Sequence, residues 1–81
     1  MRLTRALARR SNIVRYRQEV LNRIEAGTYR MALRATNQQI LESIEDIEMQ
    51  IRHPKCEPDV KEWKRADLRA LRRVLREREN K

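Results

Sequence analysis

Hydrophobic residues recur along this chain at the three- and four-residue steps of amphipathic helices. The first series predicts a helix over about residues 3–26, and its apolar side comprises Leu3, Ala6, Leu7, Ile13, Val14, Val20, Leu21 and Ile24. Gly27 and Thr28 follow, and a glycine beside a residue suited to N-capping favours a break there. A helix that continues through Gly27 is the alternative, because a lone glycine costs only about 1 kcal/mol against alanine.

The second series alternates steps of four and three residues, which is typical of a coiled-coil seam. It predicts a helix over about residues 28–52, with a seam formed by Leu33, Asn37, Ile40, Ile44, Ile47 and Ile51. Thr36 and Gln39 have the spacing of a capping box, so a second place for a break lies near residue 35, ranked below Gly27. The helix should end at His53, because a residue that precedes proline is driven out of the α region.

The third helix is predicted over about residues 58–78, with Pro58 at its first position. Its apolar side comprises Val60, Trp63, Ala70, Leu71, Val74 and Leu75. We expect Trp63 to be buried; an exposed anchor at an interface is the alternative. Because the connection over residues 54–57 is short, the second and third helices should be antiparallel neighbours. The pattern therefore predicts one all-α domain, 1–81, with an αα-hairpin preceded by an N-terminal helix, as a small bundle or an elongated coiled-coil-like arrangement.

Composition restricts the class of protein further. Charged and apolar residues each make up 40% of the chain, which suits solvated helices, leaves little material for a core and makes a homo-oligomer a further expectation. One Gly and two Pro are too few for a β-rich fold. No apolar run approaches the roughly 20 residues that span a bilayer. The single cysteine, Cys56, precludes an internal disulfide, so we expect a reducing, cytoplasmic setting.

The net charge of +8 is unevenly distributed, with +7 on residues 1–34, −4 on residues 35–51 and +5 on residues 52–81. The third helix has a cationic arc opposite its apolar side, and Arg binds phosphate or carboxylate with two parallel hydrogen bonds. This arc predicts a site for nucleic-acid backbone or another anionic partner at Arg65, Arg69, Arg72, Arg73 and Arg76, supported by Arg5 and Arg9. A solvated charged face is the structural alternative.

Arg10 and Arg17 lie one heptad apart within the apolar arc of the first helix. A buried guanidinium without a partner is costly, so each should pair with a carboxylate of the same chain, extend to the bundle edge or meet another molecule. The last interpretation predicts a protein interface formed by Leu3, Leu7, Arg10, Val14 and Arg17.

The chain lacks the residues from which common catalytic sites are built, since it has one His, one Cys and no Gly-rich phosphate loop. His53 and Cys56 supply only two of the four ligands that a structural zinc needs. We therefore expect no enzyme activity, no metal or other cofactor and no small-molecule substrate. A helix-turn-helix is disfavoured as well, because the cationic arc lacks the Asn and Gln residues that read adenine edges.

These observations predict a small basic helical protein that contacts DNA or RNA backbone through Arg-rich helix faces. The alternative is a helical adaptor, inhibitor or assembly subunit, such as a virion component, that docks on an acidic or apolar surface of a protein partner. A membrane-surface role ranks third, because the first helix lacks the Trp and Phe anchors that such helices favour.

Overall fold

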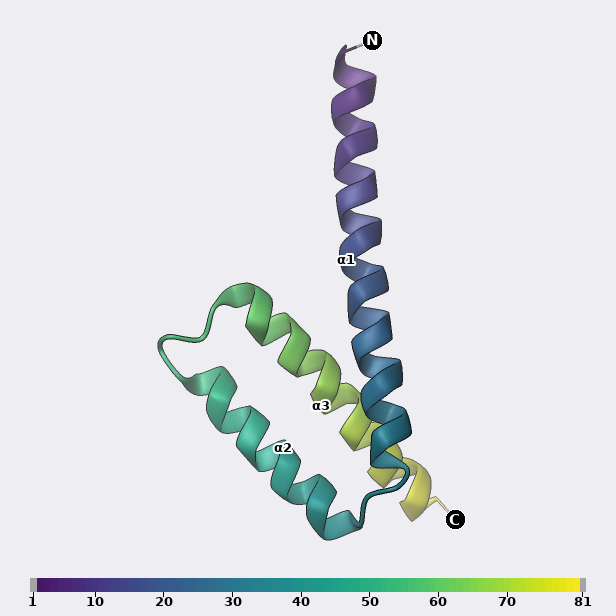
Figure 1. Ribbon diagram of the computed structural model, residues 1–81, viewed down its shortest axis with the longest axis vertical. Helices are drawn as coiled ribbons and strands as arrows, with labels where there is room; N and C mark the ends of the chain where they lie inside the picture. Colours follow the sequence, from purple (N-terminus) through teal and green to yellow (C-terminus); the bar gives the residue numbers. More distant parts are fainter. Residues whose placement is uncertain (1, 81) are drawn as a thin grey trace.

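The fold consists of three helices that share one packing element. The computed structural model describes the backbone of residues 2–80 and the side chains of residues 15–80. Over residues 2–80 it contains α1 (Arg2–Ala32), α2 (Asn37–Arg52) and α3 (Pro58–Glu79), and no strand. Both α1 and α2 pack against α3, with α2 antiparallel to it, and α1 and α2 diverge from each other (Figure 1). The predicted all-α fold with a hairpin of the second and third helices is confirmed.

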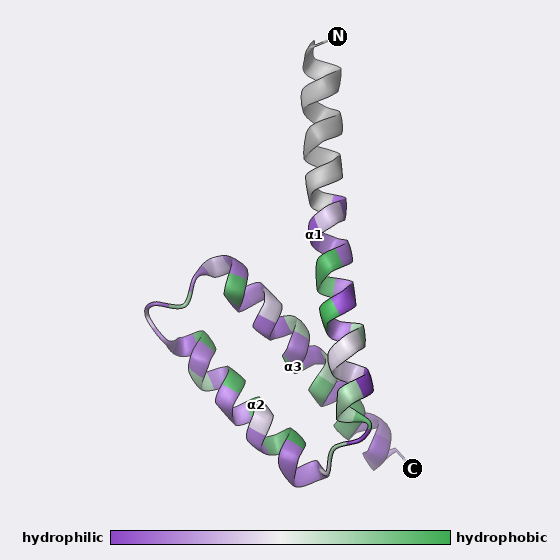
Figure 2. Cartoon of the chain, in the orientation of Figure 1, coloured by the Kyte–Doolittle hydropathy of each residue, from purple (hydrophilic) through white to green (hydrophobic). Residues whose placement is uncertain are grey.

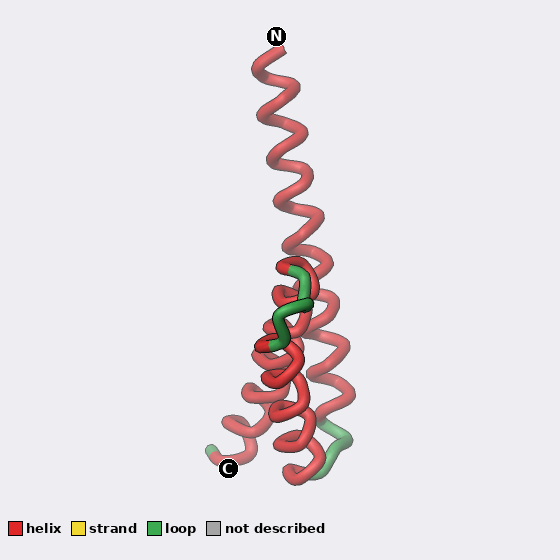
Figure 3. The backbone as a smooth tube through the Cα atoms, turned by 90° about the vertical axis from the view of Figure 1, so that its left-hand side faces the viewer, coloured by secondary structure: helices red, strands yellow, loops and turns green. Residues whose placement is uncertain are grey.

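Seen edge-on, the three helices form a thin layer (Figure 3), and the Cα trace is 17 Å across in its shortest direction. Strongly polar residues occur on every helix, interspersed with apolar ones (Figure 2). A layer of this kind leaves both sides of the molecule open to solvent.

The break between the first two helices lies at residues 33–36, so the predicted break at Gly27 is wrong. The backbone of α1 is helical through Gly27. Residues 33–36 form the turn that precedes α2. At its end the Thr36 hydroxyl accepts a 3.1 Å hydrogen bond from the Gln39 N–H, and the Gln39 side chain accepts one of 3.0 Å from the Thr36 N–H. The glycine penalty is too small to end a helix, whereas this capping box satisfies two backbone donors at the new helix start.

Arg78 of α3 closes the end of α1. Its guanidinium donates to the backbone carbonyls of Ala32 at 3.3 Å, Leu33 at 3.3 Å and Ala35 at 2.8 Å. It also donates to the side-chain oxygen of Asn37 at 2.6 Å. The last carbonyls of a helix have no intrahelical donor, so one arginine supplies the hydrogen bonds that this turn needs.

The buried core gathers where α3 meets the other helices. Ile40 of α2, Leu71 and Val74 of α3 and Ala32 of α1 form one cluster, and the partly buried residues packed against it are Tyr29, Ala35, Ile44, Ile47 and Leu75. Ile40, Leu71 and Val74 were all predicted to lie on apolar faces. This cluster joins all three helices.

Small side chains contribute the rest of the buried surface of α3. Ala66 and Ala70 are fully buried one turn apart, and Leu68 is buried as well. Ala70 lies beside Ala26 and Tyr29 of α1. The small alanine side chains allow α1 to approach α3 closely.

Three residues of the predicted faces are exposed among the described side chains, and one of them is the polar seam residue Asn37, the first residue of α2. Leu33 is 51% exposed because it lies in the turn after α1 and belongs to neither helix. Trp63 is 46% exposed, so the expectation that it is core is wrong.

We expect Thr36→Ala to lower the free energy of unfolding by about 1 kcal/mol, because it removes the side-chain acceptor of the capping box. Equilibrium urea denaturation followed by circular dichroism measures the change. Glu45→Ala at an exposed position of α2 is the control and should change stability by less than about 0.5 kcal/mol. Equal losses from the two variants would contradict the role given to Thr36.

Candidate functional site

Two arginines of the predicted α3 arc pair with carboxylates on the other helices. Arg69 Nε lies 3.5 Å from Glu25 Oε2 of α1. Arg72 donates to Glu48 of α2, and Glu48 also lies 3.7 Å from Arg52. These pairs connect α3 to both neighbours, so binding of an outside anion at Arg69 or Arg72 would compete with them.

A third arginine of the arc, Arg73, is engaged on α3 and α1. Its Nε lies 3.0 Å from Glu77 Oε1, and its guanidinium lies over the Tyr29 ring, 4.5 Å from the centroid. The Tyr29 hydroxyl donates to the other Glu77 oxygen at 2.5 Å. The pKa of Tyr29 is raised above its ordinary value, mainly because of this hydrogen bond to Glu77. Arg73 therefore serves mainly to join α3 to α1.

Arg65 and Arg76 are the members of the predicted site that stay available. Both are exposed, and neither has an ion pair or hydrogen bond within residues 15–80. Eleven residues separate them, about 16 Å along a helix axis. They are too far apart to hold a single phosphate together.

The arginine placed within the apolar arc of the first helix, Arg17, pairs with an acid of the same chain. Its Nη2 lies 3.4 Å from Asp59 Oδ1 at the start of α3, and both side chains are mostly exposed. Arg17 thus has a carboxylate of the same chain as its partner and, being mostly exposed, also fits the interpretation that it extends to the bundle edge. The other predicted side chains of the first helix lie outside the described ones, namely Leu3, Arg5, Leu7, Arg9, Arg10 and Val14.

A second group of arginines, which was not part of the predicted site, lies along the side of α1 that faces away from α3 and in the turn after α1. Four residues of this side, separated by seven, four and three positions, share one face of α1, namely Tyr16, Arg23, Gly27 and Arg30. Arg34 lies in the turn after α1 and lines the same hollow as Gly27 and Arg30. These five residues are here called the α1 basic face. The three arginines are exposed and make no ion pair or hydrogen bond with any residue in 15–80. Their regular spacing was the available signal in the sequence.

The surroundings of the α1 basic face are also cationic. Glu19 is the single acid near this line within the described side chains, and it is flanked by Arg15 and Arg23, four residues before and after it. Gly27, Arg30 and Arg34 line a shallow hollow of about 300 Å³ together with Met31. Phosphate or carboxylate groups can reach these guanidinium groups without displacing an internal partner.

Other classes of site lack their elements in the part of the chain that the structure describes. None of its helices combines the length and the apolar character needed to cross a bilayer. No three His, Cys, Asp or Glu side chains of residues 15–80 gather as metal ligands would. Nor do known proteins point to a role. No family model, curated protein or solved structure matches this chain.

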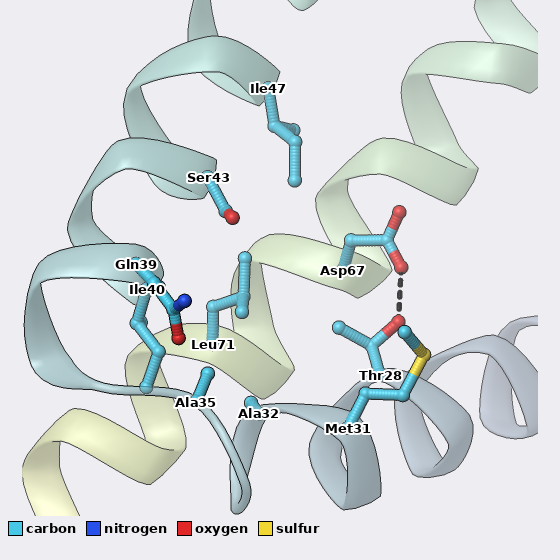
Figure 4. A pocket seen from close by; sticks show the side chains of 10 residues that line it. All are labelled: Thr28, Met31, Ala32, Ala35, Gln39, Ile40, Ser43, Ile47, Asp67 and Leu71. Atoms are coloured by element: carbon cyan, nitrogen blue, oxygen red, sulfur yellow. Dashed lines mark hydrogen bonds between the residues drawn. The ribbon is translucent and has the colours of Figure 1, made fainter.

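An apolar recess of about 290 Å³ lies at the junction of the three helices (Figure 4). Its lining comprises Thr28, Met31, Ala32, Ala35, Gln39, Ile40, Ser43, Ile47, Asp67 and Leu71. The one ionisable group among them, Asp67, accepts a 2.5 Å hydrogen bond from the Thr28 hydroxyl, drawn as the dashed line in Figure 4. Asp67 is thus the single carboxylate in the lining of this recess, and it is hydrogen-bonded to Thr28.

Proposed function

We propose that this protein binds the backbone of DNA or RNA through Arg-rich helix faces, and that the α1 basic face is its principal contact. The observation that supports this is the difference between its arginines and those of α3. Arg23, Arg30 and Arg34 are exposed without an internal partner among the described side chains, whereas three of the five predicted arginines of α3 are engaged. A guanidinium that breaks no internal bond keeps its full attraction for phosphate.

The overall charge supports the same proposal. Residues 15–80 contain fifteen Lys and Arg against twelve Asp and Glu, and Arg2, Arg5, Arg9, Arg10 and Lys81 add to this excess. The α1 basic face holds no Asn or Gln, and phosphate contacts carry no sequence information. We therefore expect binding with little dependence on base sequence, and the reducing cytoplasmic setting expected from Cys56 suits it.

The test compares two double variants in binding to a fluorescent random-sequence duplex and to a single-stranded RNA at about 50 mM salt and above. Arg23→Gln with Arg30→Gln should weaken binding and reduce the slope of log affinity against log salt by about 2, since each lost phosphate contact contributes about 1. Arg69→Gln with Arg72→Gln is the matched control, because these arginines are already paired, and should keep most of the slope. If the native protein binds neither nucleic acid at low salt, the proposal is wrong.

The protein-docking alternative has its own outcome in this assay. An acidic protein surface would also be attracted to the α1 basic face, and polyglutamate represents its chemistry without a phosphate. The planar guanidinium of Arg fits both carboxylate and phosphate. The affinities for polyglutamate and for nucleic acid are therefore compared at equal total charge. Tighter binding of polyglutamate than of the duplex or the RNA would favour an adaptor or assembly role.

A further inference from the structure

We infer that the bound nucleic-acid backbone crosses α1 directly over Gly27, which serves as its point of closest approach. This inference rests on the proposed function and adds the place and direction of the contact. The phosphates would be held by Arg23 on one side of the crossing and by Arg30 and Arg34 on the other.

The fold gives Gly27 no task of its own. It lies inside the continuous helix α1, and no residue of the described backbone has a positive φ angle that would call for glycine. A Cβ built at this position would meet nothing within 4 Å. Glycine is also less favourable than alanine inside a helix. Close approach of another molecule's backbone is a recognised use of glycine, and the open space above Gly27 allows it.

The arginines bracket this position. Arg23 lies one turn before Gly27 and Arg30 one turn after it on the same face of α1, and Arg34 lies in the turn that follows the helix. The shallow hollow over Gly27 is lined by Arg30, Arg34 and Met31. Because Gly27 has no side chain, an anion can reach the Arg30 and Arg34 side chains in this hollow, with Arg23 one turn farther along the helix.

The charges on this face also call for an anion. Arg30 in the last turn of α1 and Arg34 in the turn that follows are like charges that line one hollow, so they repel each other. Within the described side chains neither has a carboxylate partner to offset this repulsion. A phosphate between them removes the repulsion and gains two charge-assisted hydrogen-bond donors.

The experiment uses the full chain with Gly27→Ala and Gly27→Leu, and Gln18→Leu as control. Gln18 is exposed and lies nine residues from Gly27, on the opposite side of α1. Both Gly27 variants should raise the thermal midpoint, because each residue favours a helix more than glycine. Gly27→Leu should nevertheless weaken duplex binding by roughly tenfold and Gly27→Ala by less, while Gln18→Leu leaves the affinity within about twofold.

The outcomes separate this inference from the proposed function. If Gly27→Leu binds as tightly as the native protein while the Arg23 and Arg30 double variant binds weakly, the crossing point is wrong and backbone binding stands. A thermal midpoint lowered by Gly27→Leu would show an internal role for the glycine and would overturn the inference. If Gly27→Leu loses polyglutamate binding while its duplex and RNA binding are unchanged, the face would be assigned to an acidic protein instead. Absence of nucleic-acid binding by the native protein overturns both proposals.

Discussion

Ile40→Ala should lower the free energy of unfolding by about 2–5 kcal/mol, the cost of removing a large aliphatic side chain from a packed core. Ile40 is 1% exposed and is packed with Ala32, Leu71 and Val74 from the other two helices. A small domain is stabilised by only about 5–15 kcal/mol in total. The variant should therefore unfold at a clearly lower urea concentration in equilibrium denaturation.

The neighbouring residue supplies the control. Leu41 is 53% exposed on the same helix, and Leu41→Ala should cost less than about 0.5 kcal/mol because surface substitutions rarely cost more. Both variants change an aliphatic residue of the same size to alanine, so the difference between them measures burial. A larger loss for Leu41 than for Ile40 would mean that another side of α2 faces α3.

Arg78→Met should lower the free energy of unfolding by about 1–3 kcal/mol, the range for losing charge-assisted hydrogen bonds. The methionine keeps much of the aliphatic length but donates to none of the three carbonyls at the end of α1, or to Asn37. Hydrogen exchange of the α1 amides should become faster toward Ala32 as well.

Arg76→Met is the matched variant for this second experiment. Arg76 lies in the same helix, is exposed and has no partner within residues 15–80, so its replacement should change stability by less than about 0.5 kcal/mol. Arg78→Lys tests geometry, because lysine keeps the charge but not the planar fork. Full stability in Arg78→Lys would show that charge alone closes the turn.

The helix ends near the prolines were predicted from sequence because local chemistry determines them. His53, before Pro54, is the residue that follows α2, and Pro58 is the first residue of α3. The apolar spacing also identified Ile40, Leu71 and Val74. The buried Ala66 was not predicted, because alanine contributes little to a hydrophobic pattern and its burial depends on how closely another helix approaches.

The error at Gly27 had a direct effect on the predicted site. A break there divides Arg23 from Arg30 and Arg34 and assigns them to two different helices, so their common face is hidden. In the structure α1 is continuous through Gly27, so Arg23 and Arg30, seven residues apart, lie on one face, and Arg34 lies in the turn that follows.

The ion pairs between helices could not be predicted from local pattern, unlike the pairs Glu48–Arg52 and Arg73–Glu77, which lie four residues apart. Arg69 and Glu25 are 44 residues apart, Arg17 and Asp59 are 42 apart, and each pair depends on how the helices are placed against one another. Charge counting treated the arginines of α3 as equivalent. The structure separates the paired Arg69 from Arg65 and Arg76, which have no partner among the side chains of residues 15–80.

The common dependence of α1 and α2 on α3 has a consequence for how the protein is made. A ribosome produces a chain from its N-terminus, so the first two helices emerge before the element on which both of them pack. Until Leu71 and Val74 have been synthesised, Ile40 has no complete core to enter. The apolar sides of nascent α1 and α2 therefore stay uncovered, and open to non-native contacts, until translation has passed these residues.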